Sequence, residues 1–425
     1  MQDQLHVLLP TLGSAGDIHP VIALALALRA RGHRTTIFTN PNFQQQIENL
    51  GLGFSGVGTL EEGEQVLSNP DLWDARKGFD VIAKHIIIPS IPRIYEAIAE
   101  HAGPNTLIAS SAICFGARIA HDKLRLPMAS VHLQPSVLRS SVDGGMFGMI
   151  RISPSQPMWL KKGIYGLIDW LAIDRQLRGP INDFRSRLGL GPIKHAMRGW
   201  MHSPQLVIGL FPEWFGPKQP DWPPNTHVVG FVLYDAASQS PVSPEADDFL
   251  KSGERPVIFT PGSAAATMHA YFRESVEACR KLGVRAMLVT NFLEQLPPNL
   301  PPTVKAFGYL PFGAVLPRAA MLVYHGGVGT MAQTMKAGIP HLVVPHGHDQ
   351  FDNAFRVKRL GLGESIYASR YRADRVTEAI RRMIADEAVK ARCRERARTI
   401  DSQVSLTRAC ELIEDLAARK LAATA

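Results

Sequence analysis

Two ionisable side chains on a glycine-containing loop near the N-terminus could take part in proton transfer. The loop, GSAGDIHP (residues 13–20), directly follows the apolar segment HVLLP (6–10). A carboxylate and an imidazole can each accept a proton from an attacking hydroxyl group. Asp17 is the first candidate for such a base, and His19, whose imidazole titrates near neutral pH, is the second. Alternatively, Asp17 serves only as an acidic residue favoured by the dipole at a helix N-terminus.

A second glycine-rich loop, HGGVGT (325–330), follows the apolar segment AMLVY (320–324). Glycines let the backbone approach a ligand closely, and the free N–H groups at the start of a helix bind anions. We therefore expect the loop to cradle a diphosphate. The residues that would surround it are His325, Gly326, Gly327, Gly329 and Thr330. The alternative is a tight strand-to-helix turn that needs its glycines only for packing.

Further polar residues follow neighbouring segments of the same half. HGHDQ (346–350) comes after an apolar segment, and Tyr309-Leu310 lies sixteen residues before His325. Both would project from the end of a parallel sheet where ligands bind. His346, His348 and Asp349 could instead gather around a metal ion, since imidazoles and carboxylates are common metal ligands. We expect no metal, and the chain contains no Asp-x-Asp triplet.

The glycine loops lack two common nucleotide-binding signatures. The first loop does not have the pattern GxGxxG, and no acidic residue lies near the end of the second expected strand. Both absences argue against a nicotinamide enzyme. No GxxxxGK[ST] occurs in the chain, which argues against a P-loop kinase or ATPase.

The segments around these loops predict two α/β units. Residues 6–10 and 35–39 read as strands on either side of a helix that starts near Pro20 and ends at Gly32. PVIFT (256–260) opens a second unit, whose first loop carries Gly262 and Ser263. Segments that are apolar throughout are typical of parallel strands covered on both faces. We therefore predict two Rossmann-like domains that face a cleft between them.

The domain boundaries follow from composition. The N-terminal domain is expected to be residues 1–236. A Pro-, Ser- and acid-rich linker follows at 237–254. A second domain is expected at 255–401, and residues 402–425 are expected to form a C-terminal helix.

An irregular region, roughly residues 60–200, is rich in large apolar side chains. The simpler interpretation is helical packing within the first domain. The alternative is an apolar acceptor pocket, with membrane contact through amphipathic residues. The residues of that contact would be Trp159, Lys161, Lys162, Tyr165 and Trp170.

Composition limits the class of protein. The chain has 425 residues and a net charge of +8, and its four cysteines are far apart. The spacing of the cysteines excludes a disulfide framework and favours a cytoplasmic protein. If the apolar region contacts a membrane, we expect the protein to be peripheral to its inner face. Residues 370–398 carry ten basic and five acidic residues, but Val376, Ile380 and Met383 recur at helical spacing. We interpret the arginines as the solvated face of an amphipathic helix and expect no nucleic-acid partner.

The residues from Tyr309 to Asn353 resemble the C-terminal signature HCGWNST…E…P…DQ of the GT-B nucleotide-sugar glycosyltransferases of the UDP/dTDP-sugar branch. By this resemblance Tyr309 stacks on the base and Leu310 belongs to the donor site. Gly262 and Ser263 match the family's loop near the phosphates. His325 and Thr330 hold the diphosphate, while Asp349 and Gln350 contact the sugar. Two residues differ from the signature: Gln333 replaces the acidic residue for the ribose hydroxyls, and Phe312 replaces a glutamine. The loss of the carboxylate tilts the expected donor toward dTDP, because 2′-deoxyribose offers one hydroxyl fewer.

The resemblance implies that residues 1–236 bind the acceptor, that residues 255–401 bind the nucleotide sugar, and that the C-terminal helix, 402–425, returns to the first domain. It also implies a mechanism. Bacterial relatives carry Asp as the base where plant relatives carry His, and Asp17 matches that place. The expected reaction is an inverting, metal-independent single displacement that requires no cofactor.

Over nearly its whole length the chain is most similar to the rhamnosyltransferase family that makes mono-rhamnolipids in rhamnolipid biosynthesis. The stretches that carry this likeness include GSAGDIHP, LFPEWFGPKQPDWP (210–223) and HDQFDNA (348–354). It implies transfer of L-rhamnose from dTDP-L-rhamnose to the hydroxyl of a 3-(3-hydroxyalkanoyloxy)alkanoic acid, and an association with the enzyme that makes this acceptor.

Two alternatives remain open. One is a UDP- or dTDP-sugar glycosyltransferase that acts on a sterol, macrolide or flavonoid-type apolar acceptor. The other is a noncatalytic GT-B partner protein that only binds a nucleotide sugar. The presence of both Asp17 and His325 argues against the second alternative, because pure binding would need only His325.

Overall fold

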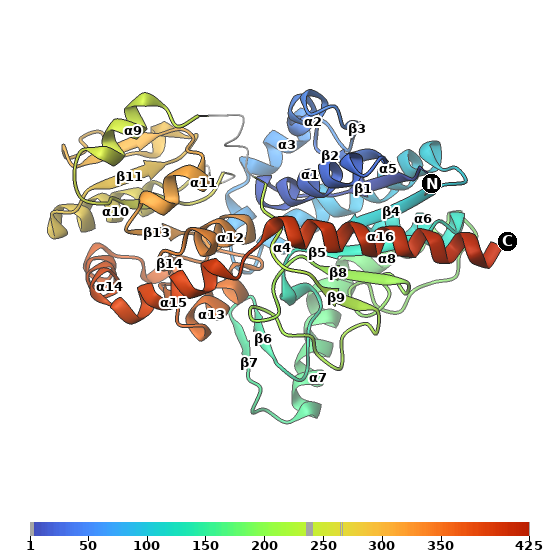
Figure 1. Cartoon of the computed structure of the whole chain (residues 1–425). Helices are drawn as coiled ribbons and strands as arrows, with labels where there is room; N and C mark the ends of the chain where they lie inside the picture. Colours follow the sequence, from blue (N-terminus) through green and yellow to red (C-terminus); the bar gives the residue numbers. More distant parts are fainter. Residues whose placement is uncertain (1–3, 235–240, 264, 266, 425) are drawn as a thin grey trace.

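The computed structural model describes residues 4–234, 241–263, 265 and 267–424, which form two α/β units with parallel sheets, as predicted (Figure 1). The first sheet has the order β3-β2-β1-β4-β5-β8-β9, and every neighbouring pair is parallel. Its strands are β1 (His6–Pro10), β2 (Arg34–Thr39), β3 (Gly53–Gly56), β4 (Thr106–Ser111), β5 (Met128–His132), β8 (Leu206–Gly209) and β9 (Thr226–Val228).

The second sheet has the order β12-β11-β10-β13-β14-β15 and is also parallel throughout. Its central strands are fully buried, which explains why their sequences are apolar without alternation. The strands are β10 (Val257–Thr260), β11 (Ala286–Val289), β12 (Val304–Phe307), β13 (Met321–Tyr324), β14 (His341–Val343) and β15 (Gly363–Ser365).

Helices pack around both sheets. Those of the first unit are α1 (Ala15–Ala30), α2 (Gln44–Asn49), α3 (Leu60–Leu67), α4 (Gly78–Ile82), α5 (Ile88–His101) and α6 (Phe115–Leu124). Those of the second are α9 (Pro244–Lys251), α10 (His269–Leu282), α11 (Phe312–Val315), α12 (Val328–Ala337), α13 (Gln350–Arg359), α14 (Ala373–Ala385) and α15 (Glu387–Arg398). Single turns lie at η1 (Pro41–Phe43), η2 (Pro70–Trp73), η3 (Ala83–Ile87), η4 (Pro135–Val137), η7 (Leu293–Gln295), η8 (Leu316–Arg318) and η9 (Ala368–Arg370).

An arm, residues 145–178, extends from the first unit away from both sheets (Figure 1). It begins with an antiparallel hairpin and continues into a long helix with one π-helical turn. Its elements are β6 (Gly145–Phe147), β7 (Ile150–Ile152), α7 (Met158–Ile168), η5 (Asp169–Ile173) and the start of α8 (Asp174–Arg187).

The last helix, α16 (Ser402–Thr424), leaves the second unit and packs against α1, β5 and β8 of the first (Figure 1). Glu414 is nearly buried there. It accepts hydrogen bonds from Arg31 at 2.6 and 2.7 Å, and its Oε1 lies 3.0 Å from His33 Nε2. The guanidinium of Arg31 and the imidazole of His33 hold the pKa of this carboxyl below its usual range, although burial alone would raise it.

The structure differs from the predicted elements at the first helix and in the linker, and agrees with them near residue 380. The prediction that the first helix starts near Pro20 was wrong, because α1 begins at Ala15 and includes Pro20 as an interior residue. Asp17 and His19 therefore lie on the helix itself. In the expected linker, 237–254, residues 237–240 lie outside the described residues and 244–251 form α9. The amphipathic helix near residue 380 is confirmed as α14.

Candidate active site

The glycine loops of the second sheet meet where its strand order reverses, between β10 and β13. Ligands of open α/β sheets bind at this point. Gly262 follows β10 with φ of +100°, and a Cβ added to it would lie 2.7 Å from Cε1 of His325, which follows β13. A side chain at position 262 would therefore displace the imidazole.

The His325 ring is enclosed by glycine on a second side as well. A Cβ on Gly327 would lie 2.3 Å from Nε2 of His325. Burial lowers the pKa of His325 to about 3, with a further contribution from the neighbouring His346. The imidazole is therefore neutral at physiological pH. Its Nδ1 is buried and has no hydrogen-bond partner among the described residues. A neutral ring fixed in this way can donate a single hydrogen bond to an anion.

The start of α12 faces the start of α1 across the two units. Gly327 is the N-cap of α12, and a Cβ on Gly329 would lie 2.9 Å from Cα of Gly16. The N-termini of two helices therefore converge, and each presents free N–H groups and the positive end of its dipole. This arrangement favours an anionic group at the junction. Thr330 lies on the first turn of α12, where its carbonyl accepts a bond from Thr334 Oγ1.

Asp17 lies on the first turn of α1, next to this junction. Its Oδ2 accepts hydrogen bonds from the backbone N–H of Ser14 at 2.9 Å and from Ser14 Oγ at 3.3 Å. Gly13, with φ of +131°, passes so close that a Cβ there would lie 2.3 Å from Oδ2. Burial raises the pKa of Asp17 to about 6, against the lowering effect of the bonds from Ser14. Asp17 thus combines a helix-capping role with the basicity that a proton acceptor needs.

A second carboxylate, Asp349, interacts electrostatically with Asp17 from the other unit. Asp349 precedes α13, and burial together with repulsion from Asp17 raises its pKa to about 7. Asn353 Nδ2 donates to Asp349 Oδ2 at 2.7 Å and to the carbonyl oxygen of Gly326 at 2.9 Å. Asn353 therefore ties the expected sugar-contacting residue to the expected diphosphate loop.

The other expected donor-site residues lie in varied environments. Tyr309 is 57% exposed, whereas Leu310 is buried in the core. Ser263 is exposed beside Gly262. Gln350 is buried, and its Oε1 accepts bonds from the N–H groups of His346 at 2.8 Å and Gly347 at 3.2 Å. The Gln350 side chain thus holds its own loop, so the sugar-contact role expected for it is not evident from its hydrogen bonds.

His19 and Gln333 are linked through Tyr234. The His19 ring lies 5.0 Å from the Tyr234 ring, and Gln333 Nε2 donates to the Tyr234 carbonyl oxygen at 3.3 Å. Burial lowers the pKa of His19 to about 4, which weakens it as a base.

His348 packs against the first unit and is not grouped with other metal-binding side chains. Its Nε2 lies 3.2 Å from the Leu72 carbonyl oxygen, and its ring lies 5.5 Å from that of Trp73. Among the described residues, no group of three His, Cys, Asp or Glu side chains is arranged to hold a metal ion.

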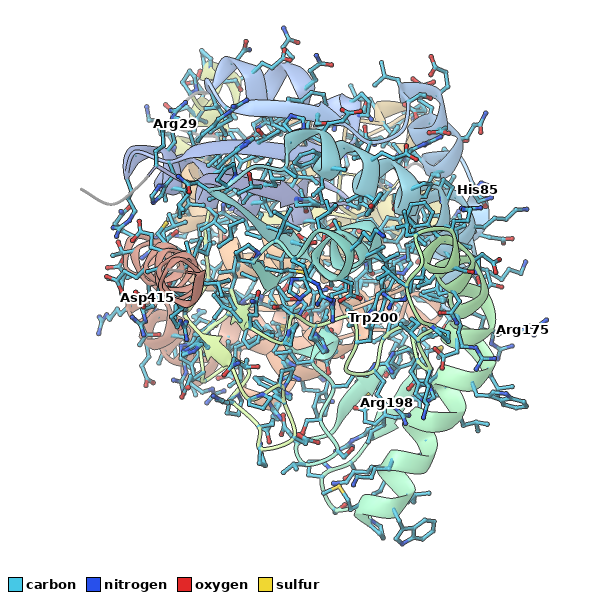
Figure 2. The ribbon with its side chains drawn as sticks, turned by 90° about the vertical axis from the view of Figure 1, so that its right-hand side faces the viewer. Arg29, His85, Arg175, Arg198, Trp200 and Asp415 are labelled. Atoms are coloured by element: carbon cyan, nitrogen blue, oxygen red, sulfur yellow. The ribbon has the colours of Figure 1, made fainter. Side chains whose placement is uncertain are left out.

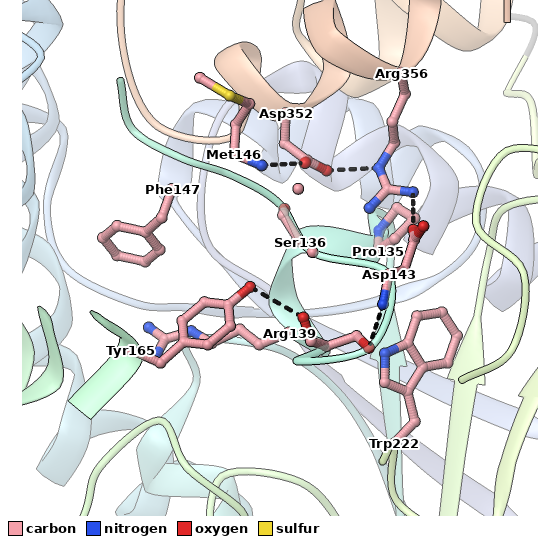
Figure 3. A pocket seen from close by; sticks show the side chains of 13 residues that line it. Pro135, Ser136, Arg139, Asp143, Met146, Phe147, Tyr165, Trp222, Asp352 and Arg356 are labelled. Atoms are coloured by element: carbon pink, nitrogen blue, oxygen red, sulfur yellow. Dashed lines mark hydrogen bonds and ion pairs between the residues drawn. The ribbon is translucent and has the colours of Figure 1, made fainter. Parts of the chain in front are cut away.

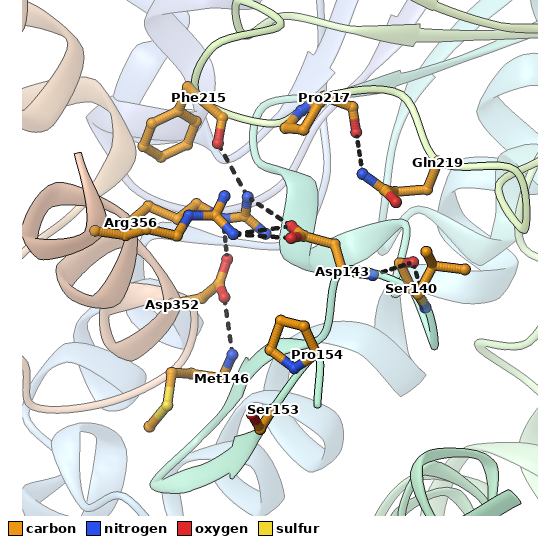
Figure 4. A network of polar contacts seen from close by, with 12 residues as sticks. Ser140, Asp143, Met146, Ser153, Pro154, Phe215, Pro217, Gln219, Asp352 and Arg356 are labelled. Atoms are coloured by element: carbon orange, nitrogen blue, oxygen red, sulfur yellow. Dashed lines mark hydrogen bonds and ion pairs between the residues drawn. The ribbon is translucent and has the colours of Figure 1, made fainter. Parts of the chain in front are cut away.

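A polar clamp around a buried ion pair joins α13 to the start of the arm and the turn before it (Figure 4), and sequence reasoning did not predict it. We define the clamp as Asp143, Met146, Asp352 and Arg356. Arg356 Nε donates to Asp352 Oδ2 at 2.6 Å and its Nη1 lies 3.8 Å from Asp143 Oδ2. Asp352 Oδ1 accepts from the Met146 N–H at 2.9 Å. The i,i+4 spacing of Asp352 and Arg356 was the available sequence signal.

A small cavity of about 10 Å³ lies beside the clamp (Figure 3). Arg139, Tyr165 and Trp222 are among the residues that line it. Its volume suits at most one water molecule. It therefore belongs to the packing between arm and α13, and an acceptor would need a wider opening elsewhere.

We expect Arg356→Met to destabilise the protein because it leaves Asp352, 2% exposed, without its cation. The loss should be about 3 kcal/mol, seen as a lower midpoint of urea unfolding. Arg359→Met is the matched control: Arg359 pairs with Asp143 at 2.9 Å but is 31% exposed, so its loss should stay below about 1 kcal/mol. Equal midpoints for the two variants would contradict the clamp.

Family comparisons agree with the two units. Residues 7–141 match the glycosyltransferase family 28 N-terminal domain, and residues 286–418 match the erythromycin biosynthesis protein CIII-like C-terminal domain. The chain is 27% identical to O-mycaminosyltylonolide 6-deoxyallosyltransferase of Streptomyces fradiae, over 97% of the chain and 98% of that enzyme. It is 25% identical to a sterol 3-beta-glucosyltransferase of Arabidopsis thaliana, over 94% of the chain and 66% of that longer enzyme.

Solved structures show the same fold. The glycotransferase of kitacinnamycin superposes with a TM-score of 0.74 at 21% identity, covering 97% of the chain and 99% of its own. The spinosyn rhamnosyltransferase complexed with thymidine diphosphate superposes with a TM-score of 0.65 at 18% identity, covering 96% and 100%. The chain thus has the GT-B fold, and the predicted fold class is confirmed.

Proposed function

We propose that this chain, a nucleotide-sugar glycosyltransferase with a family 28 N-terminal domain and an erythromycin CIII-like C-terminal domain, transfers L-rhamnose from dTDP-L-rhamnose to the hydroxyl of a 3-(3-hydroxyalkanoyloxy)alkanoic acid. The observation that supports transfer most directly is the convergence of Asp17 with the loops of His325 and Asp349. A proton acceptor from one domain and an anion cradle from the other meet at one point.

In the proposed reaction the acceptor hydroxyl attacks the anomeric carbon while Asp17 takes its proton. The bond from that carbon to the diphosphate oxygen breaks, and its electron pair leaves with the nucleoside diphosphate. The N–H groups at the start of α12 and a hydrogen bond from the neutral His325 stabilise the leaving charge. The hydroxyl attacks and the diphosphate departs on opposite faces of the anomeric carbon, so the configuration at that carbon is inverted. The protein's own dipoles stabilise the developing negative charge.

Two observations support the proposed donor, and two others support the proposed acceptor. Gln333 uses Nε2 to bind the Tyr234 carbonyl, and its Oε1 is the atom that can accept a bond from the single free hydroxyl of a 2′-deoxyribose. The spinosyn rhamnosyltransferase that shares the fold has been solved with thymidine diphosphate. For the acceptor, the sequence resemblance to rhamnolipid enzymes and the apolar arm beside the clamp are the supporting observations.

A second candidate is glycosyl transfer to a macrolide or sterol. The deoxyallosyltransferase of Streptomyces fradiae matches the chain over nearly the full length of both proteins. This match favours a macrolide acceptor, whereas the fold alone does not distinguish between acceptors. The sterol 3-beta-glucosyltransferase supports transfer of glucose to a sterol at the same site.

The deciding experiment incubates the purified chain with each donor and acceptor and analyses the products by mass spectrometry. The donors are dTDP-L-rhamnose and UDP-glucose, and the acceptors are a 3-(3-hydroxyalkanoyloxy)alkanoic acid, a macrolide aglycone and a sterol. We expect a mono-rhamnolipid from the first donor and first acceptor. Product from UDP-glucose and a sterol would replace this proposal with the second candidate. Product with the macrolide aglycone as the sole productive acceptor would do the same.

A further inference from the structure

The arm exposes an unusual concentration of large apolar side chains. Of the thirteen such side chains exposed in the described part of the chain, seven lie within residues 149–171. Trp159 is 74% and Trp170 is 67% exposed. The seven are Met149, Ile150, Met158, Trp159, Leu167, Trp170 and Leu171. Contiguous exposed apolar groups mark surfaces that bind a partner or a membrane.

These side chains are not an unfilled part of the core, because the other face of the same helix is already packed. Ile168 and Ile173 are buried against α5 and α8 residues in the first unit. The turn Asp169–Ile173 is π-helical, and its end residues face inward while Trp170 and Leu171 between them face solvent. The outward apolar face therefore remains after packing is complete.

The charges of the arm are sorted by sign. Its two acidic residues between 149 and 178, Asp169 and Asp174, are 3% and 5% exposed and point inward. Asp169 pairs with Arg139 and, at 3.0 Å, with Arg198, while Asp174 Oδ2 lies 2.7 Å from His195 Nδ1.

The exposed charges of the same segment are all basic. They belong to Arg151, Lys162, Arg175 and Arg178. Figure 2 shows Arg175 and Arg198 beside the helix that descends to the tip of the arm. A projecting surface with tryptophan, leucine and exposed lysine and arginine, but no exposed acid, matches the chemistry of an anionic membrane interface.

We propose that the outward face of residues 149–178 docks on an anionic lipid bilayer, with Trp159 and Trp170 inserted at the headgroup level. The convex, projecting shape of the arm suits insertion into a deformable interface, whereas a groove would suit a protein segment. Within the described residues, no helix has both the length and the apolar character needed to cross a membrane. The docking needs neither the sugar nor the acceptor proposed above, so the two proposals can fail separately.

The test measures sedimentation of the full chain with vesicles of phosphatidylcholine alone or with about a third phosphatidylglycerol. We expect binding to the anionic vesicles that weakens at high salt, together with a blue shift of tryptophan fluorescence. Trp159→Ser with Trp170→Ser should lower the apparent vesicle affinity at least about tenfold. Leu293→Ser with Val404→Ser is the matched control, because both residues are exposed and lie outside the arm.

Circular dichroism and calorimetric binding of the nucleoside diphosphate should be unchanged in both double variants, which shows that the fold and the donor site remain intact. The proposal would be overturned if the wild-type chain bound neither kind of vesicle, or if the tryptophan variant bound as well as the control. A dimer or a protein complex that forms through the two tryptophans, without vesicle binding, would also overturn it.

Discussion

Asp17→Asn should lower kcat for glycosyl transfer by about a hundredfold to ten-thousandfold, because an amide cannot accept the acceptor's proton. The substitution keeps the size of the side chain and an oxygen that can accept the 2.9 Å bond from the Ser14 N–H. Calorimetric binding of the nucleoside diphosphate should therefore remain close to that of the wild-type chain. Steady-state kinetics with the donor and acceptor that give product would measure the loss.

The matched control is His19→Gln on the same helix. Burial keeps the pKa of His19 near 4, so its imidazole is a weak base, and kcat should change by less than about fivefold. A large loss for His19→Gln and a small one for Asp17→Asn would assign the base to His19.

The pH profile gives a second check on Asp17. The pKa of Asp17 is raised to about 6 and that of Asp349 to about 7, so both carboxyls become protonated as the pH falls through this range. Protonated Asp17 cannot act as a base, and kcat/KM should fall about tenfold per pH unit below pH 6. Asp349→Asn should leave this acid limb near pH 6, because Asp349 has the higher pKa and is already protonated where Asp17 titrates. An acid limb that is unchanged in Asp17→Asn would contradict the assignment.

His325→Ala should lower kcat by about a hundredfold to a thousandfold, since it removes one preorganised donor to the leaving diphosphate. The imidazole is already neutral, with a pKa near 3, so the loss should come from the hydrogen bond and not from charge. It should therefore be nearly constant between pH 6 and pH 8. The kcat of each variant and the calorimetric Kd for the nucleoside diphosphate would measure it.

A matched pair of substitutions separates this role from simple packing. His325→Phe keeps a ring between Gly262 and Gly327 but has no N–H, whereas His325→Asn keeps an N–H on a smaller side chain. We expect the Phe variant to be as slow as Ala and the Asn variant to recover about tenfold. Full activity in the Phe variant would mean that the ring only fills space.

The sequence predicted the fold from local patterns. Strands such as β1 and β13 are apolar throughout because parallel strands are covered on both faces, and each is followed by a glycine loop and a helix. This order places loops at the carboxyl ends of strands whatever the rest of the chain does. The sequence thereby located the strand-to-helix junctions near Asp17 and His325. It placed the start of α1 too late, because Pro20 suits a first turn but is also accommodated inside the helix.

The tertiary structure decided which of these residues interact. Asp17 and Asp349 are 332 positions apart, and their mutual repulsion arises only when two domains face each other. The clamp between Asp143 and Arg356 and the inward turn of Gln350 depend on the same packing. The sequence also did not determine which side of the arm helix faces solvent, because a helix with apolar residues on several sides can bury any of them. Local sequence sets strands, turns and caps, whereas partners between distant residues are set by the packing of whole elements.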